Sequence, residues 1–370
     1  MRILLLGEYS NVHWTLAEGL RALGHHVTVA SNGDFWKNYP RDIDLARDTS
    51  SSLGTIRFLT KVTCSLPSFK SYDVVQLINP MFMELRAERL WPIYKYLRRH
   101  NGRVFLGAFG VDYFWVKVGM DCTTFRYSDF NIGGELRHNP DTDHIVADWL
   151  NTPKEELNRR IADDCDGIIT GLYEYEACYR PFYAEKTQYI PFPINCKLVN
   201  PASDVTSEYV NDEPLRLFIG IQRERSAYKG TDIMLRALER LKNDYPEQVE
   251  IMKAESVPFA QYQEMMNNSH ALLDQLYSYT PGMNGLLAMS KGLILIGGGE
   301  EEHYELLGER NLRPIINVQP TEEDVYDQIS DRLLSVKEDI AQLQRDSIEY
   351  IRRHHDHIRV AQQYLDFWTS

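Results

Sequence analysis

The sequence predicts an α/β fold of two doubly wound domains with parallel sheets that face each other across a cleft. Short apolar runs alternate with helix-like amphipathic segments from residue 2 onwards, and the same alternation restarts at residue 215. Between the two series, residues 191–214 are rich in Pro, Asn, Ser and Asp, a composition typical of a linker. A chain of 370 residues is long enough for two such domains of roughly 150 residues each.

The first half opens with a strand, a helix and a second strand, which is the unit from which parallel sheets are built. Gly24 ends the first helix, and the second strand follows as HVTVA. Strands are expected at 2–7, 26–30, 72–79, 102–110, within 160–170 and up to 189–190. Helices are expected at 11–23, 86–103 and 173–183.

The second half follows the same order. Strands are expected at 215–221, in VEIMKA, at 271–276 and at 292–296. Helices are expected at 231–242, 260–267, 284–291, 325–334 and 341–368. We therefore predict an N-terminal Rossmann-like domain at 1–195 and a C-terminal one at 196–350, with a terminal helix at 351–370 packing back on the first domain. Ligands of such sheets bind at the carboxyl ends of the strands.

Composition and charge exclude several classes of protein. With 43% hydrophobic and 25% charged residues, the chain is neither disordered nor a protein with many membrane spans. The net charge of −13 repels nucleic acid rather than attracting it. Residues 1–200 hold 23 Lys and Arg against 24 Asp and Glu, whereas 201–370 hold 17 against 29. This asymmetry predicts two bodies with different partners.

The sequence favours the cytoplasm as the compartment of the protein. No apolar run approaches the ~20 residues of a membrane span, and the apolar run at the N-terminus is shorter than the core of a secretory leader. The five cysteines are odd in number and form no CxxC pair, so a disulfide framework or a zinc site is not expected.

The loops after the strands do not fit a dinucleotide or a P-loop nucleotide. GEYSNVH, after the first strand, contains only Gly7 of the G-x-G-x-x-G pattern that lets the backbone approach a pyrophosphate. GGG at 297–299 follows another strand, but three glutamates come directly after it and would repel a phosphate.

A cationic loop in the second half predicts a diphosphate site. The strand LRLFIGI contains Gly220, and the loop after it carries Arg223, Arg225 and Lys229 before Gly230 and Thr231 open a helix. Cations beside a helix N-terminus bind anions through charge pairing and the helix dipole. The competing interpretation is a solvated loop whose charges have no ligand.

This segment resembles the retaining GT-B glycosyltransferases of family four, the "glycosyl transferases group one" type. The order strand, basic loop, Lys-Gly and amphipathic helix is similar to theirs, and so are VPFAQYQEMMNNSHALLDQL at 257–276 and GMNGLLAMSKGLILIG at 282–297. In the first half GHHVTVAS, YDVVQLINP and GVD at 110–112 also fit, so the resemblance covers essentially the whole chain.

The resemblance implies transfer of a sugar from a nucleotide-diphosphate donor with retained anomeric configuration, and without a metal or other cofactor. The implied catalytic residues are Asp112, Arg225 and Lys229. Arg225 and Lys229 would stabilise the charge that develops on the leaving diphosphate. The implied donor-binding residues are Gly220, Arg223, Arg225, Lys229, Val257, Gly282, Met283, Asn284, Glu300 and Glu301.

One departure from the family concerns its E-x7-E element, whose second glutamate holds the ribose hydroxyls. Tyr279 and Leu287 stand at the two glutamate positions. Because leucine cannot accept a hydrogen bond from a hydroxyl, recognition must come from elsewhere, and Glu300 and Glu301 are the candidates. The alternatives are a solvated helix start for these glutamates and a protein that is catalytically inactive.

The family binds its acceptor on the first domain. Two interpretations are open for His13, either a ligand-binding group or a cap or surface residue. Asp112 likewise either contacts the acceptor or caps a helix. Phe109 stands where the family has a histidine before Gly110. The implied acceptor-binding residues are Glu8, Tyr9, Asn11, His13, Gly110 and Asp112.

Two further segments have two interpretations each. Residues 113–144 show little periodicity but many aromatics, so they suit either an acceptor lid or plain surface packing. Residues 86–103 interleave basic and aromatic side chains, which suits either an anionic membrane surface or a solvated crossover helix.

We therefore predict a cytoplasmic glycosyltransferase, at or near the inner face of the membrane, that acts in polysaccharide, capsule or glycolipid biosynthesis. Its partners would be a nucleotide sugar and a glycan or lipid-linked acceptor. The alternatives are a nucleotide-sugar 2-epimerase and a non-catalytic GT-B protein that binds a sugar or a partner.

Overall fold

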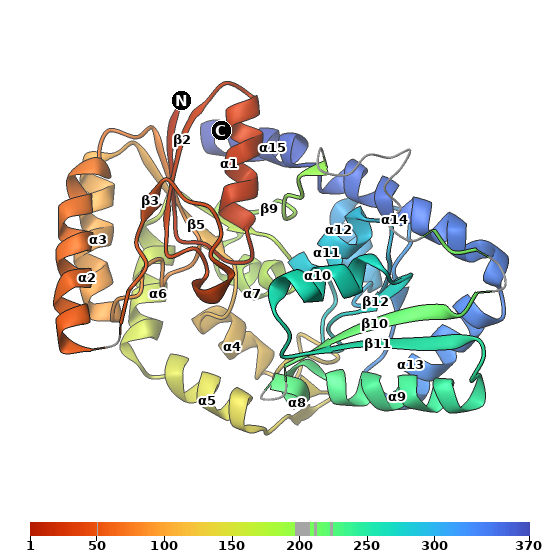
Figure 1. Ribbon diagram of the computed structural model, residues 1–370. Coiled ribbons are helices and arrows are strands. Elements are labelled where there is room, and N and C mark those ends of the chain that lie inside the picture. The colour runs from red at the N-terminus through yellow and green to blue at the C-terminus, as the bar shows by residue number, and fades with distance from the viewer. Residues whose placement is uncertain (50, 197–207, 211–212, 223–224) are drawn as a thin grey trace.

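A computed structural model of the chain describes residues 1–49, 51–196, 208–210, 213–222 and 225–370. It has two α/β domains side by side, with the N-terminal domain on the left of Figure 1 and the C-terminal domain on the right. All strands of both main sheets pair in parallel, as the sequence predicts. Much of the predicted linker, 197–207 and 211–212, lies outside the described residues.

The N-terminal sheet has seven strands in the order β3-β2-β1-β4-β5-β8-β9. Their bounds are β1 Arg2–Leu6, β2 His26–Ser31, β3 Ile43–Asp44, β4 Val74–Leu77, β5 Arg103–Ala108, β8 Gly167–Thr170 and β9 Thr187–Tyr189. The helices are α1 Val12–Ala22, α2 Ser52–Ser65, α3 Ala87–His100, α4 Tyr113–Gly119, α5 Pro140–Trp149, α6 Pro153–Asp164 and α7 Tyr173–Tyr183.

The C-terminal sheet has five strands in the order β11-β10-β12-β13-β14. They are β10 Leu215–Ile221, β11 Val249–Glu255, β12 Ala271–Leu273, β13 Ile294–Gly297 and β14 Ile316–Asn317. The helices are α8 Ser226–Lys229, α9 Thr231–Asp244, α10 Phe259–Asn267, α11 Met283–Ser290, α12 Glu301–Leu307, α13 Glu322–Ile329, α14 Ile340–His354 and α15 His357–Thr369. None of these helices, nor any other described one, is both long and apolar enough to cross a membrane.

The strands are almost wholly apolar because both faces of each sheet are covered. In β1, Ile3 and Leu5 belong to the core under α1 and α15, whereas Leu4 and Leu6 belong to the core on the opposite face. All four side chains are fully buried. The alternation along the strand therefore supplies two separate cores from one short segment.

The last two helices connect the domains. The helical stretch predicted at 341–368 forms α14 and α15, which are separated at His355 and Asp356. At this break, Ile194 donates its N–H to the His355 carbonyl at 2.7 Å and accepts from His357 N at 3.0 Å. Beyond it, α15 packs against α1, where Gly19 lies so close to His357 that a Cβ would be 2.2 Å from the His357 carbonyl oxygen.

The stretch 113–144 is more ordered than its sequence predicts. It contains α4, a short hairpin of β6 (Asn131–Ile132) and β7 (Glu135–Leu136), and the start of α5. Its middle part reaches the C-terminal domain, where Tyr228 donates its hydroxyl to Asp129 at 2.5 Å. Arg137 lies 3.4 Å over the ring centre of Tyr277. The segment thus spans the contact between the domains (Figure 1).

Candidate active site

A deep cleft of about 1630 Å³ lies between the two domains. Its walls are formed by the loops at the carboxyl ends of β1, β2, β4 and β5 on one side and of β10, β11 and β12 on the other. This is the place where doubly wound sheets bind ligands, because the loops of successive strands meet there.

The predicted diphosphate loop lies in this cleft. Gly220, Arg225 and Lys229 are all among its lining residues, whereas Arg223 lies outside the described residues. Lys229 ends α8, and Gly230 follows in a left-handed conformation with φ +73°, where a Cβ would be 2.6 Å from Leu276. Only glycine fits such a turn, so it fixes Lys229 at the point where α9 begins.

Lys229 is half-buried among charged neighbours. Burial and the nearby Arg225 lower the pKa of its ammonium, while Asp274 opposes them. Arg225 is exposed and lies 4.9 Å from the ring centre of Tyr228. Two cations here share one nearby carboxylate of their own domain, which leaves room for an anionic ligand.

The start of α11 faces the same cleft. Gly282, Met283 and Asn284 line it, and Gly282 has no side chain to cap this helix, although the Asp274 carboxylate accepts the backbone N–H of Gly285 in its first turn. Tyr262 donates its hydroxyl to Asn284 Oδ1 at 3.1 Å. The helix N-terminus therefore offers backbone N–H groups and a positive dipole end on the same side as Lys229.

Both apolar and polar side chains of the C-terminal domain line the cleft near α11. Val257 and Leu287 line the cleft, so the side chain that replaces the family's ribose-binding glutamate does face the cavity. Ser290 and Lys291 follow on α11 and also line it, with Lys291 Nζ 2.8 Å from Asn267 Oδ1. Tyr279, at the other glutamate position, does not line the cleft.

On the N-terminal side, Glu8, Tyr9, Asn11 and Gly110 line the cleft as expected from sequence. Glu8 is buried and accepts the backbone N–H groups of His13 at 3.2 Å and Trp14 at 2.9 Å, so it caps α1. Burial raises the pKa of the Glu8 carboxyl to about 8, although these hydrogen bonds act against the rise.

The placement of His13 in an acceptor site is wrong. The side chain is fully buried behind the first loop, with Nδ1 2.8 Å from the Gly7 carbonyl, and His13 does not line the cleft. Burial lowers the pKa of its imidazole to about 3, so the ring is neutral at physiological pH. His13 therefore supports the loop that carries Glu8 and Tyr9.

For Asp112 the structure supports the helix-cap interpretation rather than the ligand-binding one. It is completely buried, accepts the N–H of Trp115 at 2.9 Å as the N-cap of α4, and accepts the hydroxyl of Tyr179 at 2.5 Å. Asp112 does not line the cleft. Burial raises the pKa of this carboxyl to about 6. Its role in the structure is to cap a helix, so we do not retain it as a catalytic or acceptor-binding residue.

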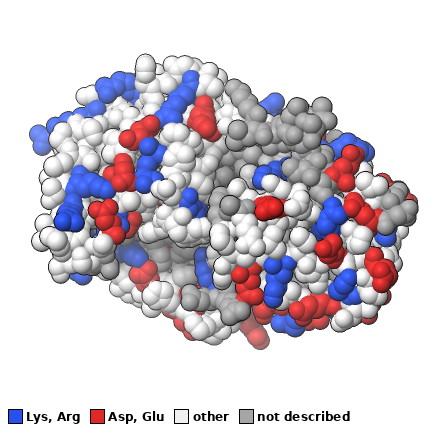
Figure 2. All heavy atoms as spheres, viewed as in Figure 1, with Lys and Arg blue, Asp and Glu red and all other residues white. Residues whose placement is uncertain are grey.

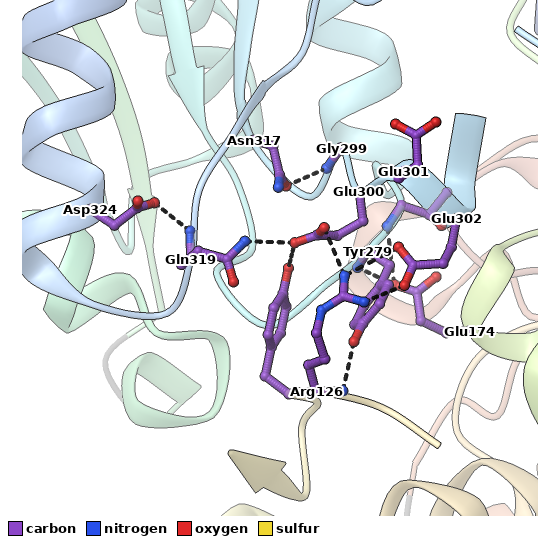
Figure 3. Close-up of polar contacts among 12 residues, drawn as sticks. Arg126, Glu174, Tyr279, Gly299, Glu300, Glu301, Glu302, Asn317, Gln319 and Asp324 are labelled. Atoms are coloured by element: carbon purple, nitrogen blue, oxygen red, sulfur yellow. Dashed lines mark hydrogen bonds and ion pairs between the residues drawn. The ribbon is translucent and has the colours of Figure 1, made fainter. Parts of the chain in front are cut away.

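Glu300 and Glu301 do not replace the missing glutamates in the cleft. Figure 3 shows Glu300 between Gln319 and Arg126, with hydrogen bonds of 2.7 and 2.8 Å, and Tyr127 also donates to it. Glu301 pairs with Arg313. Neither glutamate lines the cleft, because the first joins the two domains and the second lies on the outer surface.

The sequence analysis missed several cleft residues, among them Phe35, Trp36 and Glu174. Phe35 and Trp36 line the cleft and are 61% and 67% exposed, in a loop where Asp34 and Phe35 have φ of +57° and +59°. Glu174, at the start of α7, is buried in the wall beside the contact of the domains. The feature of the sequence that could have indicated all three is their position within a few residues of the end of a predicted strand. Among the described residues, no three His, Cys, Asp or Glu side chains group where they could hold a metal ion.

Comparison with known proteins identifies the fold. No family model matches the chain, and no curated protein sequence matches it significantly. Among solved structures, sucrose-phosphate synthase from Thermosynechococcus elongatus is 16% identical, with a TM-score of 0.64 over 100% of this chain and 98% of that one. HepE from Anabaena, in complex with UDP and glucose, is 12% identical, with a TM-score of 0.60 over 100% and 99%.

A third structure, WaaG, a glycosyltransferase involved in lipopolysaccharide biosynthesis, is 13% identical with a TM-score of 0.54 over the whole of both chains. These likenesses extend over both domains and their order along the chain. Two Rossmann-like domains that face a cleft define the class of fold. The chain has the GT-B fold.

Proposed function

We propose that the chain is a retaining, metal-independent GT-B glycosyltransferase of family four. It would move a sugar from a nucleotide-diphosphate donor to a glycan or lipid-linked acceptor, with no cofactor. The observation that carries the proposal is the position of Lys229 and Arg225 in the cleft, on the same wall as Gly282, Met283 and Asn284 at the start of α11.

These groups suit the chemistry of the leaving group. When the bond between the sugar C1 and the phosphate oxygen breaks, negative charge accumulates on the diphosphate. Lys229 and Arg225 would pair with that charge, and the amides at Met283 and Asn284 would donate to it. Burial keeps these interactions strong, because less water screens them.

The N-terminal wall suits an acceptor built of sugar rings. Phe35 and Trp36 present two exposed aromatic faces to the cleft, on a backbone whose left-handed residues cost energy. Such faces pack well against the C–H side of a pyranose ring. Tyr9 and Gly110 line the cleft next to each other, since a Cβ on Gly110 would be 3.3 Å from the Tyr9 ring.

A role at a membrane belongs to this proposal as well. We place the protein in the cytoplasm, in polysaccharide, capsule or glycolipid biosynthesis, with α3 touching an anionic membrane surface. The support is that Arg86 and three cations on α3 are exposed, while the apolar side of the helix is buried in the core. The three are Arg89, Lys95 and Arg99.

The test is a thermal-shift panel of UDP, GDP, ADP and CMP with their sugar conjugates, followed by calorimetry on the best pair. One nucleotide family should raise the melting temperature, and Lys229→Ala should weaken its binding at least about tenfold, the loss of one charge-assisted hydrogen bond. Lys253→Ala is the control, because Lys253 is exposed on the neighbouring strand and does not line the cleft. The proposal fails if no nucleotide binds, or if both variants behave like the wild type.

A binding protein without catalysis is the second candidate, because Leu287 faces the cleft without a carboxylate to replace it nearby on α11. Nucleotide-sugar binding with neither transfer nor hydrolysis would favour it. Release of a 2-epimer without any acceptor would instead indicate an epimerase.

A further inference from the structure

Glu174 is a buried carboxyl group at the contact between the two domains. It stands in the first turn of α7, directly after β8, and is 3% exposed. Its Oε1 accepts the backbone N–H of Tyr279 at 2.7 Å and that of Thr280 at 3.2 Å. Figure 3 shows the side chain reaching from the first domain towards Tyr279 in the second.

The second carboxyl oxygen of Glu174 has no protein partner. Oε2 is buried, and no described residue forms a hydrogen bond with it. Burial raises the pKa of this carboxyl, against hydrogen bonds from its own backbone N–H, from the Thr280 side chain and from the backbone N–H groups of Tyr279 and Thr280. An unsatisfied buried polar atom costs roughly 1–3 kcal/mol, so native structures rarely keep one without a ligand or a function.

The neighbourhood of Glu174 is the donor wall of the cleft. Glu174 and Thr280 both line the cavity, and Gly282, two residues after Thr280, caps the start of α11. A diphosphate at this helix end would place the group on its terminal phosphate beside the 278–280 loop. Val257 and the α11 residue Leu287 are apolar members of the same cleft lining and suit the nucleoside.

The chemistry of Oε2 selects the kind of group that satisfies it. An ionised carboxylate needs a hydrogen-bond donor, and a protonated carboxyl needs an acceptor. A hydroxyl is both donor and acceptor, so it satisfies Oε2 in either state. The sugar of a nucleotide-sugar donor carries several such hydroxyls, whereas the terminal phosphate of a nucleoside diphosphate would be repelled by the ionised form.

We propose that Glu174 binds a hydroxyl of the transferred sugar, so that the N-terminal domain supplies a carboxylate to the donor site of the C-terminal domain. The inference rests on the proposed glycosyltransferase function and deepens it. Because Oε1 remains on the Tyr279 and Thr280 amides, a bound sugar closes a bridge between both domains. Nucleotide alone does not reach this group.

The experiment compares the affinities of UDP and UDP-glucose in one protein by titration calorimetry, with GDP and GDP-mannose as a second pair. In Glu174→Gln the amide oxygen still accepts from the backbone, but the charge-assisted bond to the hydroxyl is lost. We expect the Kd ratio of nucleotide to nucleotide sugar to fall about tenfold, with the nucleotide Kd itself changed by less than about threefold.

The control is Glu176→Gln. Glu176 is buried on the same helix, but it accepts from Thr170 Oγ1 at 2.5 Å and pairs with Arg180, and it does not line the cleft. It should leave the ratio unchanged even if it lowers stability. Glu174→Asp keeps the charge on a shorter side chain and serves if Glu174→Gln fails to fold.

The two failures are distinguishable. If the ratio of the two Kd values is unchanged in Glu174→Gln while nucleotide still binds through Lys229, the inference alone is overturned. Glu174 would then only stabilise the 279–280 loop. Equal losses for nucleotide and nucleotide sugar would overturn it in the same way. Absence of binding by both nucleotide pairs to the wild-type chain would overturn the inference together with the proposed function.

Discussion

Glu309 offers the most quantitative test of how the domains are held together. It follows α12, its side chain is 6% exposed, and it accepts the backbone N–H groups of Asn311 at 2.9 Å and Leu312 at 3.0 Å. Arg353 at 3.1 Å and His354 at 2.9 Å, at the end of α14, contact the same carboxylate. Glu309 therefore ties the C-terminal domain to the helix end from which the chain crosses to the first domain.

The expected magnitude follows from the pKa of this carboxyl. Burial alone would raise it, but the four hydrogen-bonding groups lower it from 4.5 to about 2. Such a change corresponds to roughly 3 kcal/mol of unfolding free energy. Because Arg353 is 44% exposed, solvent screens its share, and we expect Glu309→Gln to lose about 2 kcal/mol at pH 7.

The sign of the pH dependence is set by the direction of this pKa change. A carboxyl whose pKa is lower in the folded state stabilises the fold above the unfolded pKa and loses that effect as the pH falls through the folded value. The difference between wild type and Glu309→Gln should therefore be full at pH 7 and shrink between about pH 4.5 and 2.

Urea unfolding at pH 7 and pH 3, followed by circular dichroism, measures this difference. Glu305→Gln is the matched control, because Glu305 is an exposed glutamate on the preceding helix, and it should change the unfolding free energy by less than about 0.5 kcal/mol. A destabilisation of Glu309→Gln that is equally large at pH 3 would refute the electrostatic reasoning and indicate lost packing instead.

Three further predictions concern the cleft and the crossing helix. Arg137→Ala removes the contact with Tyr277 and the hydrogen bond to the Ala227 carbonyl at 2.8 Å. Nucleotide affinity, measured by calorimetry, should therefore fall about fivefold. Unchanged affinity would contradict a role of these contacts in holding α8. Trp36→Ala should raise the KM for the acceptor severalfold, while the rate of donor hydrolysis and the Kd of the donor stay constant. An equally large rise in the Kd of the donor would exclude an acceptor role. Gly19→Ala places a Cβ 2.2 Å from the main-chain oxygen of His357, so we expect the melting temperature to drop by several degrees. An unchanged melting temperature would show that α15 can shift away from α1.

The regular elements were readable from sequence because their signals are local. The strand LRLFIGI was predicted at 215–221 and is found with the same bounds, since a parallel strand buried on both faces is a continuous apolar run. The helix 173–183 was likewise predicted with its observed bounds. Missed elements such as β14, two residues long, and α2, with its Ser and Thr residues, have weak local signals.

The errors concern polar residues whose partners are distant in sequence. Asp112 and His13 follow strands as ligand-binding residues do, but Tyr179 and the Gly7 carbonyl satisfy them inside the protein. Glu300 is bound by Arg126, more than 170 positions earlier. Because no local pattern encodes such pairings, sequence places a polar residue at a strand end without telling whether it faces the cleft.

The charges of the cleft walls do not follow the net charges of the two halves of the chain. The acidic half carries paired charges on its surface, where Glu322 and Glu323 of α13 pair with Arg236 and Arg240 of α9. Figure 2 shows acidic and basic side chains interspersed at the lower right of the face it presents. Paired charges at that surface are screened by solvent and have little influence on the cleft.

Among the described residues lining the cleft, the C-terminal wall is basic and the N-terminal wall is acidic. The C-terminal wall carries Arg225, Lys229 and Lys291 against Asp274, and the N-terminal wall carries Glu8, Glu18, Asp34, Glu84, Asp129 and Glu174 against Lys37 and Lys154. Both of those lysines already pair with aspartates. Under the proposed function, an anionic diphosphate is therefore expected on the basic wall and its uncharged sugar against the other, where carboxyl groups accept hydrogen bonds from hydroxyls. The walls would thus orient the proposed donor, and the more acidic half of the chain supplies the basic wall.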